Sequence, residues 1–554
     1  MKNNTFFKKI KIKNTKLSIL FNLLYSNLHL IIFSLILLGG FFLSFSVLKN
    51  IPLTHEDSSN LNTIKVLLEE KRISPFSPYQ GVNIFLIPFV SFLDYTPLSL
   101  RIAHSFFLFF AILFTYLFVN IYYNKKVALV TSLLMILNTF FITHPENDNI
   151  LPFCSALFLF LFFYYYKYKN KFFLYLTFLF AGYAIFLKIT FLYFFISCAV
   201  SFLFFFRKDY KIKEFLNFKT TPKLILFFLL GLSPFIYHNI SNNFPFFHLV
   251  FSNFFSTPLL HSNSNILGNL LFRFLHLQQI IATGSWFFQP KESLLNNLLL
   301  FSSIVYLTII KYSKKHLFII SSIFLFLIMS TFSISNLRIS QVLILLPLLM
   351  ILIARFLVSL FNYKKYYMKI LTLLLLFLIF IFSLFKYVDI YEISKKDVLY
   401  ENIQPKYAKA HQSSALYFKN TNNKIILGIS IPVYFIQGLL PLSYAPVILC
   451  DWEGGYWTYP FPSVNCINAK KLINENINDT NARWMFASFS RSENKDLSIY
   501  YDFCAIKDLE KNFCYKPFLI FIKEVSKNNM TMILEHSIKD SKGKPVYDIY
   551  KLSK

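Results

Sequence analysis

Long apolar runs separated by short polar segments dominate the first two thirds of the sequence. Many runs approach the roughly 20 residues that a helix needs to cross a bilayer. The run Leu28–Leu48 has no small-residue cleavage site at its end, which favours a retained span over a signal peptide. The pattern predicts an α-helical polytopic membrane protein with about eleven spans, at residues 29–48, 104–122, 127–144, 150–166, 172–187, 190–206, 223–241, 294–311, 317–334, 339–361 and 369–387.

Short clusters of lysine and arginine between these runs predict an orientation. Membrane proteins concentrate Lys and Arg in their cytoplasmic loops. With the amino terminus in the cytoplasm, six clusters fall on the cytoplasmic side: Lys8–Lys16, Lys125–Lys126, Lys167–Lys171, Arg207–Lys223, Lys311–Lys315 and Lys364–Lys369. We therefore expect a multi-pass protein of the plasma (inner) membrane. Residues 1–28 form its basic cytoplasmic amino terminus, and residues 29–387 form a transmembrane domain with outer loops at 49–103, 143–149 and 242–293.

The carboxy-terminal region, 388–554, has a different pattern. It holds 17 of the 27 acidic residues, and its apolar runs are short. Ile425–Ile431 and Phe518–Val525 have the pattern of strands, and DSKGK at 540–544 has the pattern of a turn into a last strand. We expect a mixed α/β soluble domain on the extracytoplasmic side.

Four of the six cysteines lie in this region, at Cys450, Cys466, Cys504 and Cys514. In an oxidising compartment, four cysteines suggest two disulfides. Short loops favour the pairs Cys450–Cys466 and Cys504–Cys514, and free thiols in a small core are the alternative.

The net charge of +28 raises the question of nucleic acid as a partner. The distribution of charge argues against it. Residues 1–387 hold 34 of the 55 Lys and Arg but only 10 of the 27 acids, and most of these cations sit in short loops. No nucleic-acid-binding motif accompanies them. We expect membrane lipid as a partner and no nucleic acid.

Two pairs of acids lie just beyond predicted spans on the outer side. Glu56 and Asp57 follow the first span, and Glu146 and Asp148 follow the third. Ionisable groups near a membrane are costly and mark functional sites. Carboxylates from two loops suit general-base catalysis on a hydroxyl, or cation binding. Solvated loop acids, with Asp57 as a helix N-cap, are the alternative.

We also expect four cations at this outer side of the membrane, where the positive-inside trend predicts few of them. Lys188 ends an apolar run, Arg338 lies in a turn, Arg101 precedes the second span, and Arg273 lies in the loop at 242–293. A lipid-linked phosphate at that face would give them a partner. Snorkelling at the end of a span is the alternative for each.

The order of these features resembles a known group. It comprises the Glu56-Asp57 pair, SPFSPYQGVNIFLIP, the arginine-led LRIAHSFFLFFAILFTYLFV, ENDNILPF with Asp148, AGYAIFLKITFLYF with Lys188, LLGLSPFIYHN, and LRISQVLILLPLL with Arg338. This order is similar to that of polytopic glycosyltransferases of the C-type fold, in particular the protein O-mannosyltransferase family and the aminoarabinose transferase that modifies lipid A. The resemblance covers roughly residues 29–360. Relatives usually read Asp then Glu after the first span, so the swapped order leaves either acid as the catalytic one.

The resemblance implies an inverting hexosyl- or pentosyltransferase that takes its sugar from a polyprenyl phosphate and passes it to a cell-envelope acceptor. Asp57 or Glu56 would act as the base, and Asp148 and Glu146 would support the site or bind a divalent metal (Mg²⁺ or Mn²⁺) where members use one. Lys188 and Arg338, with Arg101 and Arg273, would hold the donor phosphate. A secondary transporter, or a non-catalytic scaffold for envelope assembly, is the alternative. The scarcity of charges deep in the spans and the lack of an inverted repeat disfavour a transporter.

Overall fold

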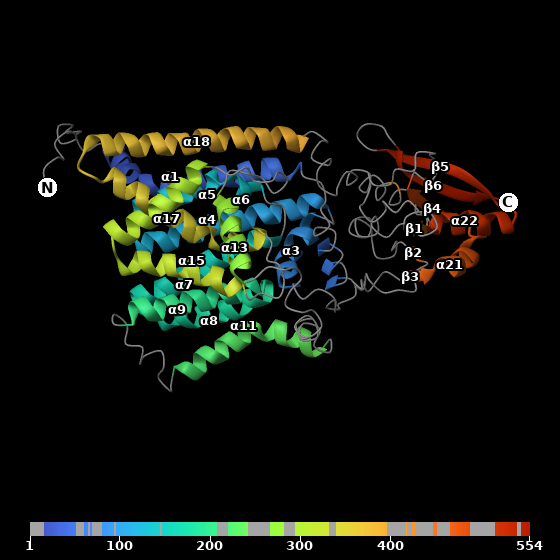
Figure 1. The fold of residues 1–554 in the computed structure, drawn as a ribbon, viewed down its shortest axis with the longest axis horizontal. Helices are drawn as coiled ribbons and strands as arrows, with labels where there is room; N and C mark the ends of the chain where they lie inside the picture. The colour runs from blue at the N-terminus through green and yellow to red at the C-terminus, as the bar shows by residue number, and fades with distance from the viewer. Residues whose placement is uncertain are drawn as a thin grey trace.

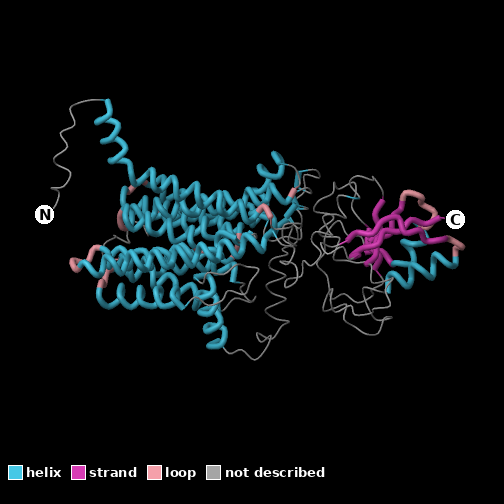
Figure 2. The backbone as a smooth tube through the Cα atoms, turned by 90° about the horizontal axis from the view of Figure 1, so that it is seen from above, coloured by secondary structure: helices cyan, strands magenta, loops and turns pink. Residues whose placement is uncertain are grey.

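The structure is a computed structural model. It describes residues 16–50, 60–61, 63–64, 67–68, 80–93, 96–143, 147–207, 220–241, 266–281, 294–331, 339–395, 417, 424–427, 447–450, 466–487, 516–539 and 545–553. The described residues form two parts, a set of long helices and a smaller strand-rich part that lies beyond one end of them (Figures 1 and 2).

Helices occur over all eleven predicted spans. They are α1 (Lys16–Leu48), α4 (Pro97–Tyr122), α5 (Lys125–Leu137) with α6 (Thr139–Thr143), α7 (Ile150–Tyr168), α8 (Lys171–Leu187), α9 (Thr190–Phe206), α11 (Thr221–Ser241), α14 (Leu294–Val305) with the π-helical turn η2 (Tyr306–Ile310), α15 (Lys314–Thr331), α16 (Ile339–Val342) with the 3₁₀ turn η3 (Leu343–Leu345) and α17 (Leu346–Phe361), and α18 (Tyr366–Lys395). Six of the described helices are long and apolar enough to cross a membrane on their own, namely α1, α4, α7, α15, α17 with η3, and α18. The protein is therefore a multi-pass membrane protein, and the total of eleven crossings stays a prediction.

Short polar caps set where the helices begin and end. The side chain of Asn124 accepts a hydrogen bond from Val127 N at 3.0 Å and begins α5, and Asn170 accepts one from Phe172 N at 3.0 Å at the start of α8. Lys169 ends α7 in the left-handed conformation, with φ 59°. Such short connections turn the chain sharply, so α4 packs on α5 and α7 packs on α8 as neighbours.

The helices have an inner and an outer set. The side chains of α17 are almost all buried, so it is the central helix. Most of the side chains of α18 are exposed, and they are predominantly large and apolar, which suits contact with lipid. Serine and tyrosine hydroxyls tie α1 to its neighbours: Ser44 Oγ donates to Ile142 O at 3.0 Å, and Tyr387 OH donates to Leu43 O at 3.1 Å.

One helix crossing depends on two glycines. A Cβ atom at Gly182 in α8 would lie 2.1 Å from the carbonyl oxygen of Phe228 in α11, and one at Gly231 would lie 1.9 Å from that of Leu179. No side chain fits there, so the two backbones touch directly. In membranes, where lipid is as apolar as the helix surface, such close approach of small residues is a main source of helix association.

Two helices lie within segments that the sequence assigns to outer loops. They are α3 (Gln80–Leu93) and α13 (Ile266–Ile281). Each helix lies between two predicted spans, so the outer-loop assignment of these stretches stays a prediction. On α13, Arg273 and His276 are buried whereas Leu271 is exposed, so this helix turns a polar side towards its neighbours. α3 packs on α4 and α8, and α13 packs on α15 and α16.

The carboxy-terminal part contains a six-stranded mixed sheet in the order β3-β2-β1-β4-β6-β5. Strands β1 (Lys424–Leu427), β2 (Val447–Cys450), β3 (Cys466–Asn468) and β4 (Ala482–Ala487) are parallel, and β6 (Pro545–Ser553) runs antiparallel to β4 and to β5 (Thr531–Lys539). Helices α21 (Ala469–Asn476) and α22 (Lys516–Lys527) cover one face of the sheet. The predicted strands at 425–431 and after residue 544 overlap β1 and β6.

The predicted strand Phe518–Val525 is wrong, because these residues lie in α22. A short apolar run does not by itself distinguish a strand from a buried helix. Phe521 and Val525, four residues apart, both lie on the same side of α22 and pack against Trp484 of β4. In a helix, this four-residue spacing places both side chains against the sheet, which favours the helix over a strand.

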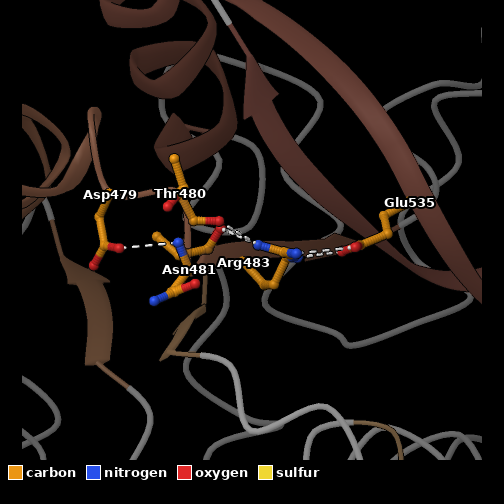
Figure 3. A network of polar contacts seen from close by, with 6 residues as sticks. Asp479, Thr480, Asn481, Arg483 and Glu535 are labelled. Carbon is orange, nitrogen blue, oxygen red and sulfur yellow. Dashed lines mark hydrogen bonds and ion pairs between the residues drawn. The ribbon is translucent and has the colours of Figure 1, made fainter.

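A β-bulge in β5 lies where a salt bridge connects this strand to β4. Leu534 pairs with Tyr550 and His536 pairs with Ile549, so Glu535 is the extra residue of β5. A bulge redirects the side chain of the extra residue. Glu535 meets Arg483 of β4 through two contacts, one from Nε to Oε2 and one from Nη2 to Oε1 at 3.0 Å (Figure 3).

The predicted disulfides remain a prediction. Cys504 and Cys514 lie outside the described residues. The parallel register pairs Ile448 with Cys466 and Cys450 with Asn468. Strand spacing and rise place diagonal Cα atoms about 8 Å apart, beyond the usual disulfide range. A Cys450–Cys466 bond would therefore need a shift of this register.

Candidate active site

A buried ion pair joins two of the predicted site residues. Lys188 Nζ lies 2.8 Å from Asp148 Oδ1, and only 6% and 1% of these two residues are exposed. Asp148 lies in the 3₁₀ turn η1 (Asn147–Asn149), immediately before α7. Ion pairs survive burial only when their geometry is good, since each charge loses its water. The sequence placed both residues at one level of the membrane, and the tertiary structure brings them into contact.

Lys188 is held at a break between two helices. Its backbone is extended, its N–H donates to Ala184 O at 3.0 Å, and its carbonyl accepts from Phe191 N at 2.9 Å. α3 packs tightly beside this break: a Cβ atom at Gly81 would lie 3.0 Å from Leu187 Cα. The ammonium group is therefore presented from a rigid corner of the bundle and not from the flexible end of a span.

Arg101 is fully buried in α4. The sequence placed it ahead of the second span, but α4 begins at Pro97, capped by Thr96, so Arg101 lies within the helix. Ser105 Oγ donates to Arg101 O at 2.9 Å, and α4 contacts the turn η1 that carries Asp148. His104, three residues after Arg101, is also fully buried.

Helix α13 carries the same kind of pair, a buried arginine, Arg273, followed three residues later by a buried histidine, His276. Only 2% of Arg273 and 4% of His276 are exposed. Burial lowers the pKa of Arg273, and burial together with the Arg273 charge lowers the pKa of His276 to about 4. Asn138 Nδ2 donates to Ile280 O at 2.8 Å and fixes the end of α13 to the break between α5 and α6. His276 is therefore neutral near pH 7, which leaves Arg273 as the charged group of this helix.

Helix α16 connects these elements. It begins at Ile339, directly after Arg338 in the chain, and it contacts both α13 and η1. The side-chain oxygens of Gln341 on α16, Gln279 on α13 and Asn83 on α3 are buried, and none of them accepts a hydrogen bond from the part of the chain described here. Buried polar atoms are rarely left without a partner. α16 contacts η1, α3 contacts α8, and α13 contacts α16, so helices next to the elements of the Asp148–Lys188 pair offer acceptors suited to a polar ligand.

Several predicted site residues lie outside the described residues: Glu56, Asp57, Glu146 and Arg338. The chain on either side of the Glu56-Asp57 pair is nevertheless placed. α1 ends at Leu48, and Asn60, Leu61 and Ile64 lie in helical segments and are buried. Their roles stay predictions.

The described residues do not by themselves favour a metal. None of them form a group of three or more His, Cys, Asp or Glu side chains suited to a metal ion. Asp148 is already paired with the Lys188 ammonium, which competes with a cation for the same carboxylate.

Sequence reasoning missed the two histidines and the buried amides. The signal was present as a repeated spacing, since Arg101 and His104 in RIAH match Arg273 and His276 in RFLH. Residues three apart share one side of a helix. Two helices thus present the same Arg-His pair, one from the second predicted span and one from the outer loop.

The fold is that of the polytopic membrane glycosyltransferases of the C type. Among solved structures, the chain is similar to ArnT from Cupriavidus metallidurans in the apo state. The TM-score is 0.59 at 10% sequence identity, and the match covers 95% of this chain and 98% of ArnT. The structure of the same protein bound to undecaprenyl phosphate gives a TM-score of 0.57 at 11% identity, with the same coverage. At such low identity the likeness establishes the fold. No protein-family profile and no curated protein sequence matches the chain.

Proposed function

We propose that the protein is a membrane glycosyltransferase that moves a sugar from a polyprenyl-phosphate-linked donor to an acceptor of the cell envelope on the non-cytoplasmic face. The observation that carries the proposal is the buried Lys188–Asp148 pair in a fold shared along almost its whole length with a protein whose structure holds undecaprenyl phosphate. The buried Arg101 lies on α4, which contacts the turn η1 that carries Asp148. A phosphate monoanion or diester is the natural partner for buried lysine and arginine.

In the proposed reaction, the carboxylate of Asp57 or Glu56 takes the proton from an acceptor hydroxyl or amine. The acceptor atom forms a new bond to the anomeric carbon while the bond from that carbon to the phosphate oxygen breaks, so the configuration inverts. The electron pair of the broken bond leaves with the polyprenyl phosphate. A positioned general base is typically worth about 10²–10⁴ in rate.

Lys188 stabilises the leaving phosphate in this proposal, with Arg338, Arg101 and Arg273 as further phosphate ligands. Asp148 is a positioning residue, because its contact with Lys188 Nζ at 2.8 Å fixes where the ammonium stands. Preorganised cations are effective at the point where negative charge develops, since they need no rearrangement during the reaction. Glu146 is proposed only as a further supporting acid.

The test measures transfer in cells and with purified protein. Mass spectrometry of envelope glycans, glycolipids and glycoproteins, with and without the gene, identifies the product. Transfer is then measured for Asp57→Asn, for Glu56→Gln, and for Asp389→Asn as a control, an exposed acid on α18. Loss of transfer by at least about 100-fold is expected in one of the first two variants and no loss in the control.

Full activity in both Asp57→Asn and Glu56→Gln would remove the assignment of the base. An unchanged envelope without the gene, together with solute uptake by vesicles that contain the purified protein, would favour the transporter instead.

A further inference from the structure

A second cluster of cations lies at the opposite end of the helices from Lys188. Arg101 stands near the beginning of α4, whereas Tyr122 and Tyr123 stand at its end. There, Tyr122 OH donates to Lys315 O at 2.9 Å, and the Lys315 ammonium reaches back to Tyr122 O. This end is the predicted cytoplasmic face, because it carries the basic clusters at 125–126, 167–171 and 311–315.

Arg355 is the centre of the cluster. It projects from α17, the central helix, and not from a loop. Its Nε donates to His316 Nε2 at 3.3 Å, and its guanidinium lies over the ring of Tyr123 with 5.5 Å to the centroid. Because Nε2 of His316 accepts, Nδ1 carries the proton and donates to Lys311 O at 2.7 Å. His316 is therefore a neutral support that fixes the direction of Arg355.

Lys311, whose carbonyl accepts from His316, ends a π-helical turn with its own N–H. Lys311 N donates to Tyr306 O at 3.0 Å across the turn η2. π-helical turns often mark functional sites. The turn also presents two strongly exposed apolar side chains, Ile309 and Ile310, beside Lys311.

The part of the chain that the structure describes supplies no counter-charge to this cluster. Within the described residues, no carboxylate pairs with Arg355, Lys315 or His316. The hydroxyls of Tyr123 and Ser359 are also buried there and form no hydrogen bond with described residues. Ser359 is one turn beyond Arg355 on α17. The cluster thus has a guanidinium, an ammonium and two hydroxyl groups as donors, for which the described residues supply no anion.

We propose that this cluster binds the phosphate of an anionic phospholipid from the cytoplasmic leaflet. That leaflet carries anionic lipids, and basic pockets between spanning helices bind their headgroups. Arg355 binds the phosphate through its two Nη groups, Lys315 adds a second charge, and the acyl chains lie along Ile309 and Ile310. A free phosphate ion would use the same donors but not the apolar surface.

The experiment uses the full-length protein purified in a neutral detergent. Native mass spectrometry measures the retention of phosphatidylglycerol, with phosphatidylcholine as the zwitterionic comparison and inorganic phosphate as the free-anion comparison. The variants are Arg355→Gln, Arg355→Lys and Tyr123→Phe. Lys126→Gln is the matched control, since it removes one exposed positive charge from the same face.

We expect one retained phosphatidylglycerol per wild-type protein and at least about tenfold weaker retention in Arg355→Gln, as for loss of a charged hydrogen-bond pair. Arg355→Lys and Tyr123→Phe should each weaken it by a smaller factor, and Lys126→Gln should stay within about twofold of wild type. If Arg355→Gln does not fold, these two milder variants decide.

Unchanged retention in the Arg355 and Tyr123 variants would overturn the proposal. So would equal losses in Lys126→Gln and Arg355→Gln, which would indicate diffuse attraction to the face. Equal retention of phosphatidylcholine, or binding of inorganic phosphate without phosphatidylglycerol, would overturn the assignment to an anionic lipid. None of these outcomes depends on whether the protein transfers a sugar.

Discussion

Neutralising Asp148 should destabilise the protein through Lys188. At 2.8 Å, two unit charges attract by about 6 kcal/mol if the effective dielectric constant is about 20. Much of this attraction offsets the loss of water around two groups that are almost fully buried. In Asp148→Asn the attraction is gone but the ammonium is still buried, so we expect a loss of about 3–5 kcal/mol in the free energy of unfolding.

A double-mutant cycle isolates this pair. Lys188→Met should be destabilising for the same reason, because it leaves the Asp148 carboxylate buried. The double variant buries neither charge, so it should recover most of the lost stability, with a coupling of about 3 kcal/mol. Unfolding of the purified protein in mixed micelles by a denaturing detergent measures all four forms. A coupling below about 0.5 kcal/mol would refute the energetic role of the pair.

The same variants separate stability from function. If Lys188 binds the donor phosphate, the double variant should be stable and still inactive, with weaker binding of polyprenyl phosphate. A stable double variant with wild-type transfer would show that the pair is structural alone.

Three further changes test other parts of the structure. Gly182→Ala should cost about 1–3 kcal/mol and broaden the size-exclusion profile, because the new Cβ meets a backbone oxygen; Gly39→Ala, with nothing within 4 Å, is the control and should be neutral or stabilising. The neutral form of His276, whose pKa burial lowers to about 4, contributes stability that is complete above about pH 6.5. That contribution, about 3 kcal/mol, is lost as the pH falls towards 4, and His276→Gln should remove this slope in thermal unfolding. Arg483→Met should lower the stability of the sheet by about 1–2 kcal/mol in limited proteolysis, with the value reduced because Glu535 is about one-third exposed; cleavage unchanged from wild type would refute it.

The helices over the predicted spans, and the placing of Asp148 and Lys188 at one side of the membrane, were predictable from the sequence, because both depend on local composition. A run of apolar residues must be shielded from water wherever it lies, and lysine and arginine mark the cytoplasmic loops whatever the fold. The position of Asp148 and Lys188 at the same side of the membrane followed from the order of the predicted spans. Local pattern was insufficient where packing decides, as at Phe518–Val525, because a short apolar run takes the conformation that its neighbours accommodate.

The sequence by itself determined that this chain is a multi-pass membrane protein with charged groups gathered at the ends of its helices. Only the tertiary structure decided which charges meet. Asp148 and Lys188 are brought into contact because η1 and the break between α8 and α9 meet at one end of the helices. Arg355 is joined to His316 and Tyr123 at the other end by the packing of α17 against α4 and α15. Contacts between residues far apart in the chain depend on how helices cross, and no local pattern encodes that crossing.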